Sequence, residues 1–103
     1  MPDDKPIDTE HLEQMAALFK AMGDPSRLRL LNELSEKEGC VGELAETTGL
    51  SHANTSKHLS VLRAVGLVCY TRKGNSKCFA LTSRMISEIC LCIGKRRSNN
   101  EEL

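Results

Sequence analysis

Two short helical patterns joined by one tight turn restrict the fold of this chain more than any other feature of its sequence. Residues 42–49 (GELAETTG) have a helical apolar period and end in a glycine. Ser51, a residue type favoured at helix starts, begins a second pattern directly afterwards. Leu59 and Leu62 form its apolar stripe, and Gly66 ends it. Helices of these lengths with so short a connection predict a helix-turn-helix.

A β-hairpin is predicted immediately after this helix pair. Residues 67–72 (LVCYTR) and 76–81 (SKCFAL) are both β-prone, and the glycine-containing turn KGN separates them. Cys40 and Val41 are expected to form a very short strand ahead of the pair. A hairpin that follows a helix-turn-helix is its wing, so the sequence predicts a winged helix-turn-helix that is mainly α with a small β-hairpin.

The rest of the chain predicts two helices before this unit and one after it. The first is expected from residues 8–9 to Gly23. The second starts at once at residues 24–25, an Asp-Pro start signal, and runs to about Ser35. The last, which begins near Ser83, completes the order helix, helix, short strand, helix, helix, two strands, helix. The expected inward-facing residues are Leu28, Leu31 and Leu34 in the second helix, and Ile86, Ile89 and Ile93 in the last.

The length of 103 residues corresponds to one domain. We expect this domain to cover residues 9–95, between a flexible acidic tail at 1–8 and a flexible tail at 96–103. With one Tyr, two Phe and no Trp the core must be aliphatic, and a second subunit is an expected source of further buried surface. Because the chain has neither an apolar stretch of about 18 residues nor a signal-peptide pattern, we expect no membrane association and a cytoplasmic location.

The formal net charge of zero conceals an uneven distribution of charge. Residues 1–50 carry five basic and eleven acidic side chains, whereas residues 51–98 carry nine basic side chains and one acidic side chain. A basic half on a neutral protein suits a polyanion that approaches from one side. A solvated face with chance clustering would give the same counts.

The second helix of the pair carries short hydrogen-bonding side chains at its N-terminal end, where a recognition helix meets base edges and phosphates in the major groove. Leu59 and Leu62, together with Thr55, belong to its buried stripe. Helical geometry then turns Ala53 and Lys57 outward. The predicted DNA contacts are Ser51, His52, Asn54, Thr55, Ser56 and Lys57 in this helix, and Arg72, Lys73, Asn75 and Lys77 in the hairpin.

Several of these residues also have a purely structural interpretation. Ser51 fits a plain helix cap, and histidines such as His52 and His58 are more often surface or packing residues than ligands. His58 lies close to the buried side and is expected to hydrogen-bond within the fold. Asn54 and Lys57 could be ordinary solvated residues, and only their combination with the basic hairpin favours DNA contact.

Three stretches together resemble the ArsR/SmtB family of winged-helix repressors. They are ALFKAMGDPSRLRLLNEL at 17–34, CVGELAETTGLSHANTSKHLSVLRAVGLV at 40–68 and the hairpin turn RKGN at 72–75. The resemblance covers roughly residues 12–93. It implies a homodimer joined through its first and last helices, with two recognition helices that read an imperfect palindrome in double-stranded operator DNA. It also implies repression of a nearby operon, which ends when an effector binds.

The effector sites of that family are incomplete in this chain. Arsenic- and cadmium-responsive members carry a Cys-Val-Cys-Asp-Leu-Cys type motif at the start of the third helix, where this chain has CVGELA and keeps only Cys40. The Asp and His ligand pairs of the zinc-responsive last helix are missing, and that segment offers Cys90 and Cys92 instead. Asn32 occupies the position at which persulfide-sensing members have a cysteine.

The five cysteines favour thiol chemistry or metal binding over a disulfide framework. A hairpin turn centred between Lys73 and Gly74 would set Cys69 opposite Cys78 on the outer face of the sheet, with Cys40 of the neighbouring strand pointing the same way. Three such thiolates would suit a soft metal or metalloid ion. Alternatively, Cys69 and Cys78 could form a reversible cross-strand disulfide.

Cys90 and Cys92 are the alternative thiols. Residues two apart on a helix point to different sides, so these two could meet only their symmetry mates across a dimer interface. Packing as small buried hydrophobes is the commoner role of such cysteines.

The sequence therefore predicts a dimeric DNA-binding repressor that a thiol-reactive or soft-metal effector releases from its operator. A regulator without a small-molecule effector remains open, as does a protein-interaction module on the same fold. An enzyme is not indicated, because the chain shows no nucleophile–base pairing and no phosphate-cradling glycine loop.

Overall fold

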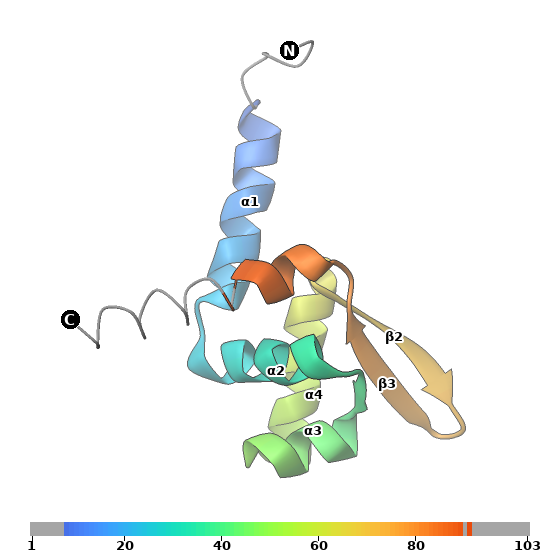
Figure 1. Cartoon of the computed structure of the whole chain (residues 1–103). Helices are drawn as coiled ribbons and strands as arrows, with labels where there is room; N and C mark the ends of the chain where they lie inside the picture. The colour runs from blue at the N-terminus through green and yellow to red at the C-terminus, as the bar shows by residue number, and fades with distance from the viewer. Residues whose placement is uncertain (1–7, 90, 92–103) are drawn as a thin grey trace, which may run out of the picture.

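The computed structural model describes residues 8–89 and 91 and has the predicted winged helix-turn-helix architecture (Figure 1). Its elements are α1 (Thr9–Met22), α2 (Pro25–Glu36), β1 (Gly39–Cys40), α3 (Val41–Thr48), α4 (His52–Ala64), β2 (Val68–Lys73) and β3 (Ser76–Leu81). Residues 84–89 and 91 are helical, as expected for the last helix. The tails expected at the two ends fall outside the described residues except for Asp8, and so does Ile93.

Side-chain caps fix the residues at which three of the helices begin. In each case a short polar residue just before the helix accepts a hydrogen bond from a backbone N–H in the first turn. The caps are Asp8 with His11 at 2.9 Å, Asp24 with Arg27 at 3.0 Å, and Ser51 with Asn54 at 3.1 Å. These backbone hydrogen bonds favour the ionised carboxylate and hold the pKa of Asp8 and of Asp24 below its usual range.

The short strand and the third helix both begin one residue earlier than expected. Gly39 belongs to β1, and Val41, expected in the strand, is the first residue of α3. The carboxylate of Glu43 accepts a hydrogen bond from the backbone N–H of Cys40 at 3.0 Å. This bond reaches back from the third helical residue to the residue before the helix, which places the start of α3 at Val41.

The core is aliphatic, as predicted. Leu30 and Leu31 of α2 and Leu59 and Leu62 of α4 have no exposed surface. The prediction that Leu28 faces inward is wrong, since 41% of this residue is exposed. The remaining buried apolar residues of this core are Ala21, Met22, Leu34, Leu44, Leu67, Val68, Phe79 and Ile86.

The three strands form one antiparallel sheet in the order β1-β3-β2. The predicted hairpin register is wrong, because Cys69 pairs with Ala80 and Cys78 with Thr71. The turn is centred one residue later than expected, at Gly74 and Asn75, and Gly74 has the positive φ of 66° that two-residue hairpin turns favour. A shift of the turn by one residue moves cross-strand partners by two, so the predicted common face of Cys69 and Cys78 is retained.

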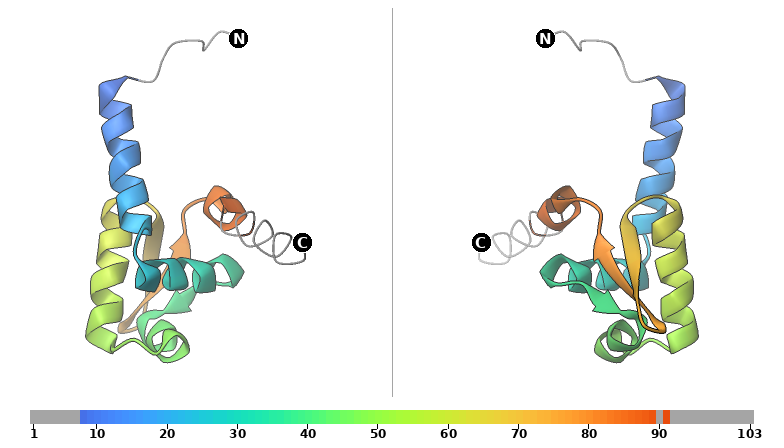
Figure 2. Two further views of the ribbon diagram at one scale, coloured as in Figure 1. Left: turned by 90° about the vertical axis from the view of Figure 1, so that its left-hand side faces the viewer. Right: turned by 90° about the vertical axis from the view of Figure 1, so that its right-hand side faces the viewer.

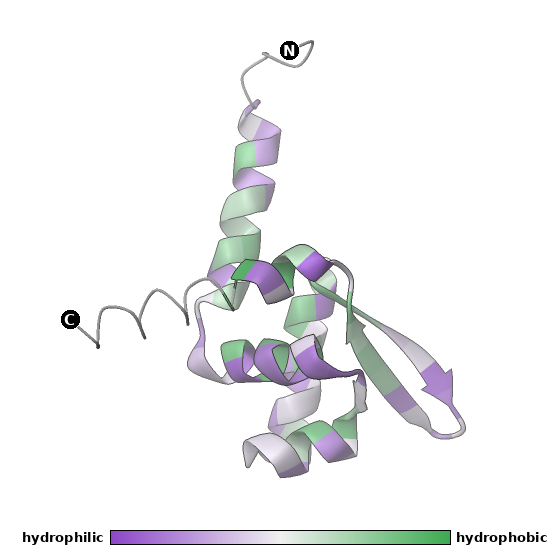
Figure 3. Ribbon diagram, in the orientation of Figure 1, coloured by the Kyte–Doolittle hydropathy of each residue, from purple (hydrophilic) through white to green (hydrophobic). Residues whose placement is uncertain are grey.

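The helix-turn-helix and the hairpin lie side by side at one end of the molecule. Figure 2 shows the hairpin running along α4, which contacts β2, while α1 extends away from the rest of the fold. Hydropathy colouring shows apolar residues along the projecting part of α1 (Figure 3). Within residues 8–89 and 91, no helix combines the length and apolar character needed to cross a membrane.

Gly49 offers a test of the turn between α3 and α4. It ends α3 with a φ of 78°, and a Cβ added there would meet no atom within 4 Å. The cost of Gly49→Ala therefore comes from the backbone, and we expect a loss of about 1–2 kcal/mol in the free energy of unfolding. Urea unfolding measures this loss.

Gly42 provides the matched control for that substitution. It lies inside α3, and its added Cβ would also meet nothing within 4 Å. Gly42→Ala should therefore stabilise the protein by up to about 0.5–1 kcal/mol through helix propensity. Equal effects of the two substitutions would contradict the conformational requirement at Gly49.

Candidate nucleic-acid interface

α4 presents the polar face that helical geometry predicts. Leu59 and Leu62 are fully buried, whereas Ala53, Lys57 and Ser60 are exposed. The orientation of the helix follows from this burial, because only one face of α4 can pack against the core while the opposite face stays open to a ligand. Among the predicted contacts in this helix, His52 and Asn54 are also exposed, and Ser56 is half-buried.

Thr55 does not belong among the predicted DNA contacts. Its side chain is 0% exposed, and its hydroxyl donates a hydrogen bond to the carbonyl oxygen of Ser51 at 2.8 Å. Helical geometry had already put Thr55 on the buried stripe, and the structure corrects its inclusion in the DNA-contacting set. The residue supports the start of α4 from inside the fold.

Ser51 caps α4 and is exposed at the same time. Its Oγ accepts the hydrogen bond that caps α4, and the residue itself is exposed at the end of the helix. The hydroxyl proton is not used by the cap and can be donated to an anion. The N-terminus of α4 also attracts negative charge, because its first backbone N–H groups lack carbonyl partners within the helix.

All four predicted hairpin contacts are exposed, but their surroundings differ. Lys73 donates a hydrogen bond to the carboxylate of Glu38 at 3.1 Å, so part of its charge is neutralised. Arg72 and Lys77 lie directly opposite each other on β2 and β3. Neither of them has a carboxylate within ion-pair distance among the described residues. Asn75 forms part of the turn itself.

Tyr70 and Arg63 are part of this surface and were missed by the sequence analysis. The guanidinium of Arg63 lies 4.7 Å and the ammonium of Lys77 4.8 Å from the centre of the Tyr70 ring. Both distances fit cation–π contacts, which hold the two side chains over the hairpin. The strand alternation of Tyr70 with Arg72 could have indicated a shared face, whereas no local pattern points to Arg63.

A hollow of about 260 Å³ connects the start of α4 with the tip of the hairpin. From α4 it is lined by His52 and Ser56, and from the hairpin by Arg72, Asn75 and Lys77. Its other lining residues are Val41, Gly42 and Ser76. No carboxylate lines the hollow, so five of the predicted DNA contacts surround one space of neutral and positive character.

His58 hydrogen-bonds within the fold, as the sequence analysis predicted. Its Nδ1 lies 3.4 Å from a guanidinium nitrogen of Arg27, the residue whose backbone N–H donates to the Asp24 cap. This contact joins α2 to α4. His58 is therefore a structural residue of the helix pair.

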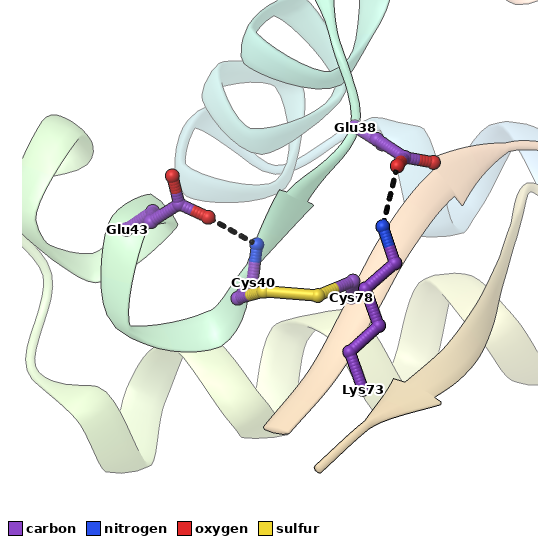
Figure 4. The surroundings of a disulfide bond; sticks show 5 residues. All are labelled: Glu38, Cys40, Glu43, Lys73 and Cys78. Carbon is purple, nitrogen blue, oxygen red and sulfur yellow. Dashed lines mark hydrogen bonds and ion pairs between the residues drawn. A yellow bond between two sulfur atoms is a disulfide. The ribbon is translucent and has the colours of Figure 1, made fainter. Parts of the chain in front are cut away.

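The cysteines are arranged differently from the prediction. Cys40 and Cys78 are joined by a disulfide, with their Cα atoms 3.9 Å apart on paired strands (Figure 4). Cys69 is exposed and its thiol donates to the carbonyl oxygen of Ala80 at 3.8 Å, so the predicted Cys69–Cys78 pair is wrong. The alternative thiols Cys90 and Cys92 lie outside the described residues.

The described cysteines do not fit the soft-metal site that the sequence analysis considered. The sulfur atoms of Cys40 and Cys78 are bonded to each other, and Cys69 lies diagonally across the sheet from Cys78. Within residues 8–89 and 91, no three His, Cys, Asp or Glu side chains are grouped so that they could hold a metal ion.

Comparison with known proteins identifies the family. Residues 24–70 match the family model described as "Bacterial regulatory protein, arsR family". A transcriptional repressor SmtB homolog from Synechocystis is 36% identical over 80 residues, which cover 78% of this chain and 61% of that protein's length. The HTH-type transcriptional regulator YgaV of Escherichia coli is 40% identical over 78 residues, which cover 75% of this chain and 79% of YgaV.

Solved structures give the same result. NolR from Sinorhizobium fredii superposes with a TM-score of 0.76 at 33% identity, over 88% of this chain and 94% of NolR. Rv0081 from Mycobacterium tuberculosis superposes with a TM-score of 0.78 at 30% identity, over 92% of this chain and 96% of Rv0081. The chain belongs to the ArsR family, whose members are winged helix-turn-helix DNA-binding transcriptional regulators and not enzymes.

Proposed function

We propose that this chain acts as a homodimeric repressor, which binds double-stranded operator DNA and releases it when an effector reacts with its thiols. The observation that carries the proposal is the hollow between α4 and the hairpin tip, around which five predicted DNA contacts gather without a carboxylate. A surface of this kind, beside an exposed helix N-terminus, suits the phosphate backbone of a duplex.

The exposed start of α4 would enter the major groove. Asn54 can pair with an adenine edge, and Lys57 can reach a guanine or a phosphate. Ala53 is exposed one residue before Asn54 and is small enough to let the helix seat deeply. Arg72 and Lys77, on the hairpin side of the hollow, would contact the adjacent backbone and fix the position of the helix in the groove.

An apolar face on α1 supports the dimer. Leu12, Met15 and Phe19 follow helical spacing and are 52%, 42% and 57% exposed. Large apolar side chains exposed together on one surface indicate a protein–protein interface. Leu28, Met85 and Leu91 are the other large exposed apolar residues of the described chain. We infer that α1 and the helical residues 84–89 and 91 of two copies pack together, so that two α4 helices face two half-sites.

Salt dependence separates this function from a protein-interaction module on the same fold. When a protein binds DNA through several phosphate contacts, its affinity for the duplex falls steeply as the salt concentration rises. The first experiment therefore measures binding of the full chain to a labelled duplex from upstream of its own gene across a salt series. A steep loss of affinity with salt supports the DNA function, and failure to bind any duplex contradicts it.

Arg72 tests the proposed backbone contacts. Log affinity for DNA falls with log salt concentration. Arg72→Gln should make this fall shallower, by about one unit of slope for each protomer, because one phosphate contact is lost. Lys37→Gln, at an exposed position after α2 and outside the hollow, is the control with the same loss of charge. Equal slopes for Arg72→Gln and the unmodified protein would show that Arg72 does not contact DNA.

Ser51 allows its capping role to be separated from DNA contact. Ser51→Ala loses the cap and should lower the free energy of unfolding by about 1 kcal/mol. Ser51→Asp keeps a good cap but puts a negative charge where we expect a phosphate, so stability should stay near its original value while duplex affinity falls about tenfold or more. Urea unfolding and fluorescence anisotropy measure the two effects. Full DNA affinity of Ser51→Asp would leave Ser51 as a cap alone.

Phe19 tests the proposed dimer interface. Phe19→Glu should convert the dimer to a monomer, because a carboxylate in the centre of the apolar face would be buried without a partner. Lys20→Glu changes the charge of the neighbouring exposed position on α1 and should leave the dimer intact. Sedimentation equilibrium of both variants gives the result. A Phe19→Glu protein that remains dimeric would place the interface elsewhere.

A further inference from the structure

We propose that Cys40 and Cys78 form a redox modification site that reacts with low-molecular-weight disulfides, and that its oxidation lowers the affinity of the protein for operator DNA. The inference rests on the proposed function and names the thiols through which an effector acts. It concerns β1 and β3, which join the helix-turn-helix to the hairpin.

The fold brings these two cysteines together without rearrangement. They are 38 residues apart in the sequence but occupy paired positions on β1 and β3, with a Cα–Cα distance of 3.9 Å. Cα atoms closer than about 7 Å can be bridged by a disulfide. The antiparallel pairing therefore holds the two thiols within bonding distance once they are reduced.

Exposure assigns different roles to the two thiols. Cys40 is partly exposed on an edge strand, whereas Cys78 is only 7% exposed on the central strand. In oxidation, the thiolate of Cys40 attacks one sulfur of the small disulfide, which forms a mixed disulfide and releases one small thiolate. The thiolate of Cys78 then attacks the Cys40 sulfur, which closes the Cys40–Cys78 bond and releases the second small thiolate. Both cysteines are oxidised, and the small disulfide is reduced to two thiols.

The bond joins two of the segments that line the hollow that we assign to the DNA backbone. Val41 and Gly42, which line it, directly follow Cys40, and Ser76 and Lys77, which also line it, directly precede Cys78. The disulfide therefore fixes the separation of these two segments, whereas in the reduced protein the hollow can adjust to a phosphate backbone.

The ion pair beside the disulfide also lowers the affinity for DNA while the disulfide is closed. Glu38, two residues before Cys40, accepts a hydrogen bond from Lys73 at 3.1 Å, as Figure 4 shows. While β1 is held against β3, this carboxylate stays next to a basic residue of the hairpin and competes with a phosphate for its charge. Opening the disulfide removes this covalent restraint on β1, so a phosphate can displace Glu38 from Lys73 more readily.

Cys69 supplies a matched control for this site. It lies on the same face of the sheet as Cys78, but it is exposed and its cross-strand partner is Ala80. Cys69→Ser therefore removes a thiol from the same sheet without removing the bond. A protein that keeps only Cys40 and Cys78, with Cys69, Cys90 and Cys92 changed to Ser, isolates the pair.

The experiment equilibrates this two-cysteine protein, and the unmodified chain, in buffers of reduced and oxidised glutathione. Mass spectrometry after alkylation of free thiols reports the Cys40–Cys78 bond, and anisotropy of the labelled operator duplex reports affinity at constant salt. We expect the oxidised form of both proteins to bind at least tenfold more weakly, and a reductant to restore binding. Cys40→Ser and Cys78→Ala should bind with the affinity of the reduced protein under both conditions, while circular dichroism checks that they fold.

The possible failures are distinguishable. If the disulfide does not form in oxidised glutathione, or if oxidised and reduced proteins bind the duplex equally, the switch is wrong and the proposed DNA function stands. If Cys40→Ser still loses affinity on oxidation, the site lies at other thiols and the proposal is again wrong. A reduced protein that binds no duplex overturns the proposed function, and the switch with it.

Discussion

The burial of one stripe of α4 is the constraint on which the rest of this structure depends. Leu59 and Leu62 have no exposed surface, and Thr55 beside them closes the first turn from within. Because this face is fixed against the core, the opposite face and the N-terminal end of α4 have only one direction in which to point. The hairpin, which packs along α4, then completes the hollow at that end.

Most of the fold could be predicted from the sequence because its helices are marked locally. Asp8, Asp24 and Ser51 cap helices at the residues expected, and Gly49 ends α3 in the left-handed conformation that favours glycine. The outward direction of Lys57 followed from helical geometry alone. Such features depend on a few neighbouring residues, so one sequence without relatives was enough to indicate them.

The features that the sequence did not predict correctly depend on contacts between distant segments. The hairpin register depends on whether the turn is centred at Lys73 and Gly74 or at Gly74 and Asn75. The residues of the two strands do not distinguish these two turns. Whether Leu28 or Leu30 faces inward depends on how α2 packs against α3, α4 and β3. The cation–π contacts of Arg63 and the pairing of Cys40 with Cys78 likewise join residues that no local pattern connects.

The position of Tyr70 gives the molecule a built-in optical reporter. The chain contains one Tyr and no Trp, so its intrinsic fluorescence arises almost entirely from this single ring. The cationic ends of Arg63 and Lys77 lie 4.7 and 4.8 Å from the centre of this ring, and the ring of Phe79 lies beside it at a centroid distance of 5.3 Å. Its emission therefore originates from the junction of α4 with the hairpin, and motion of the wing can be followed in solution without attaching a dye.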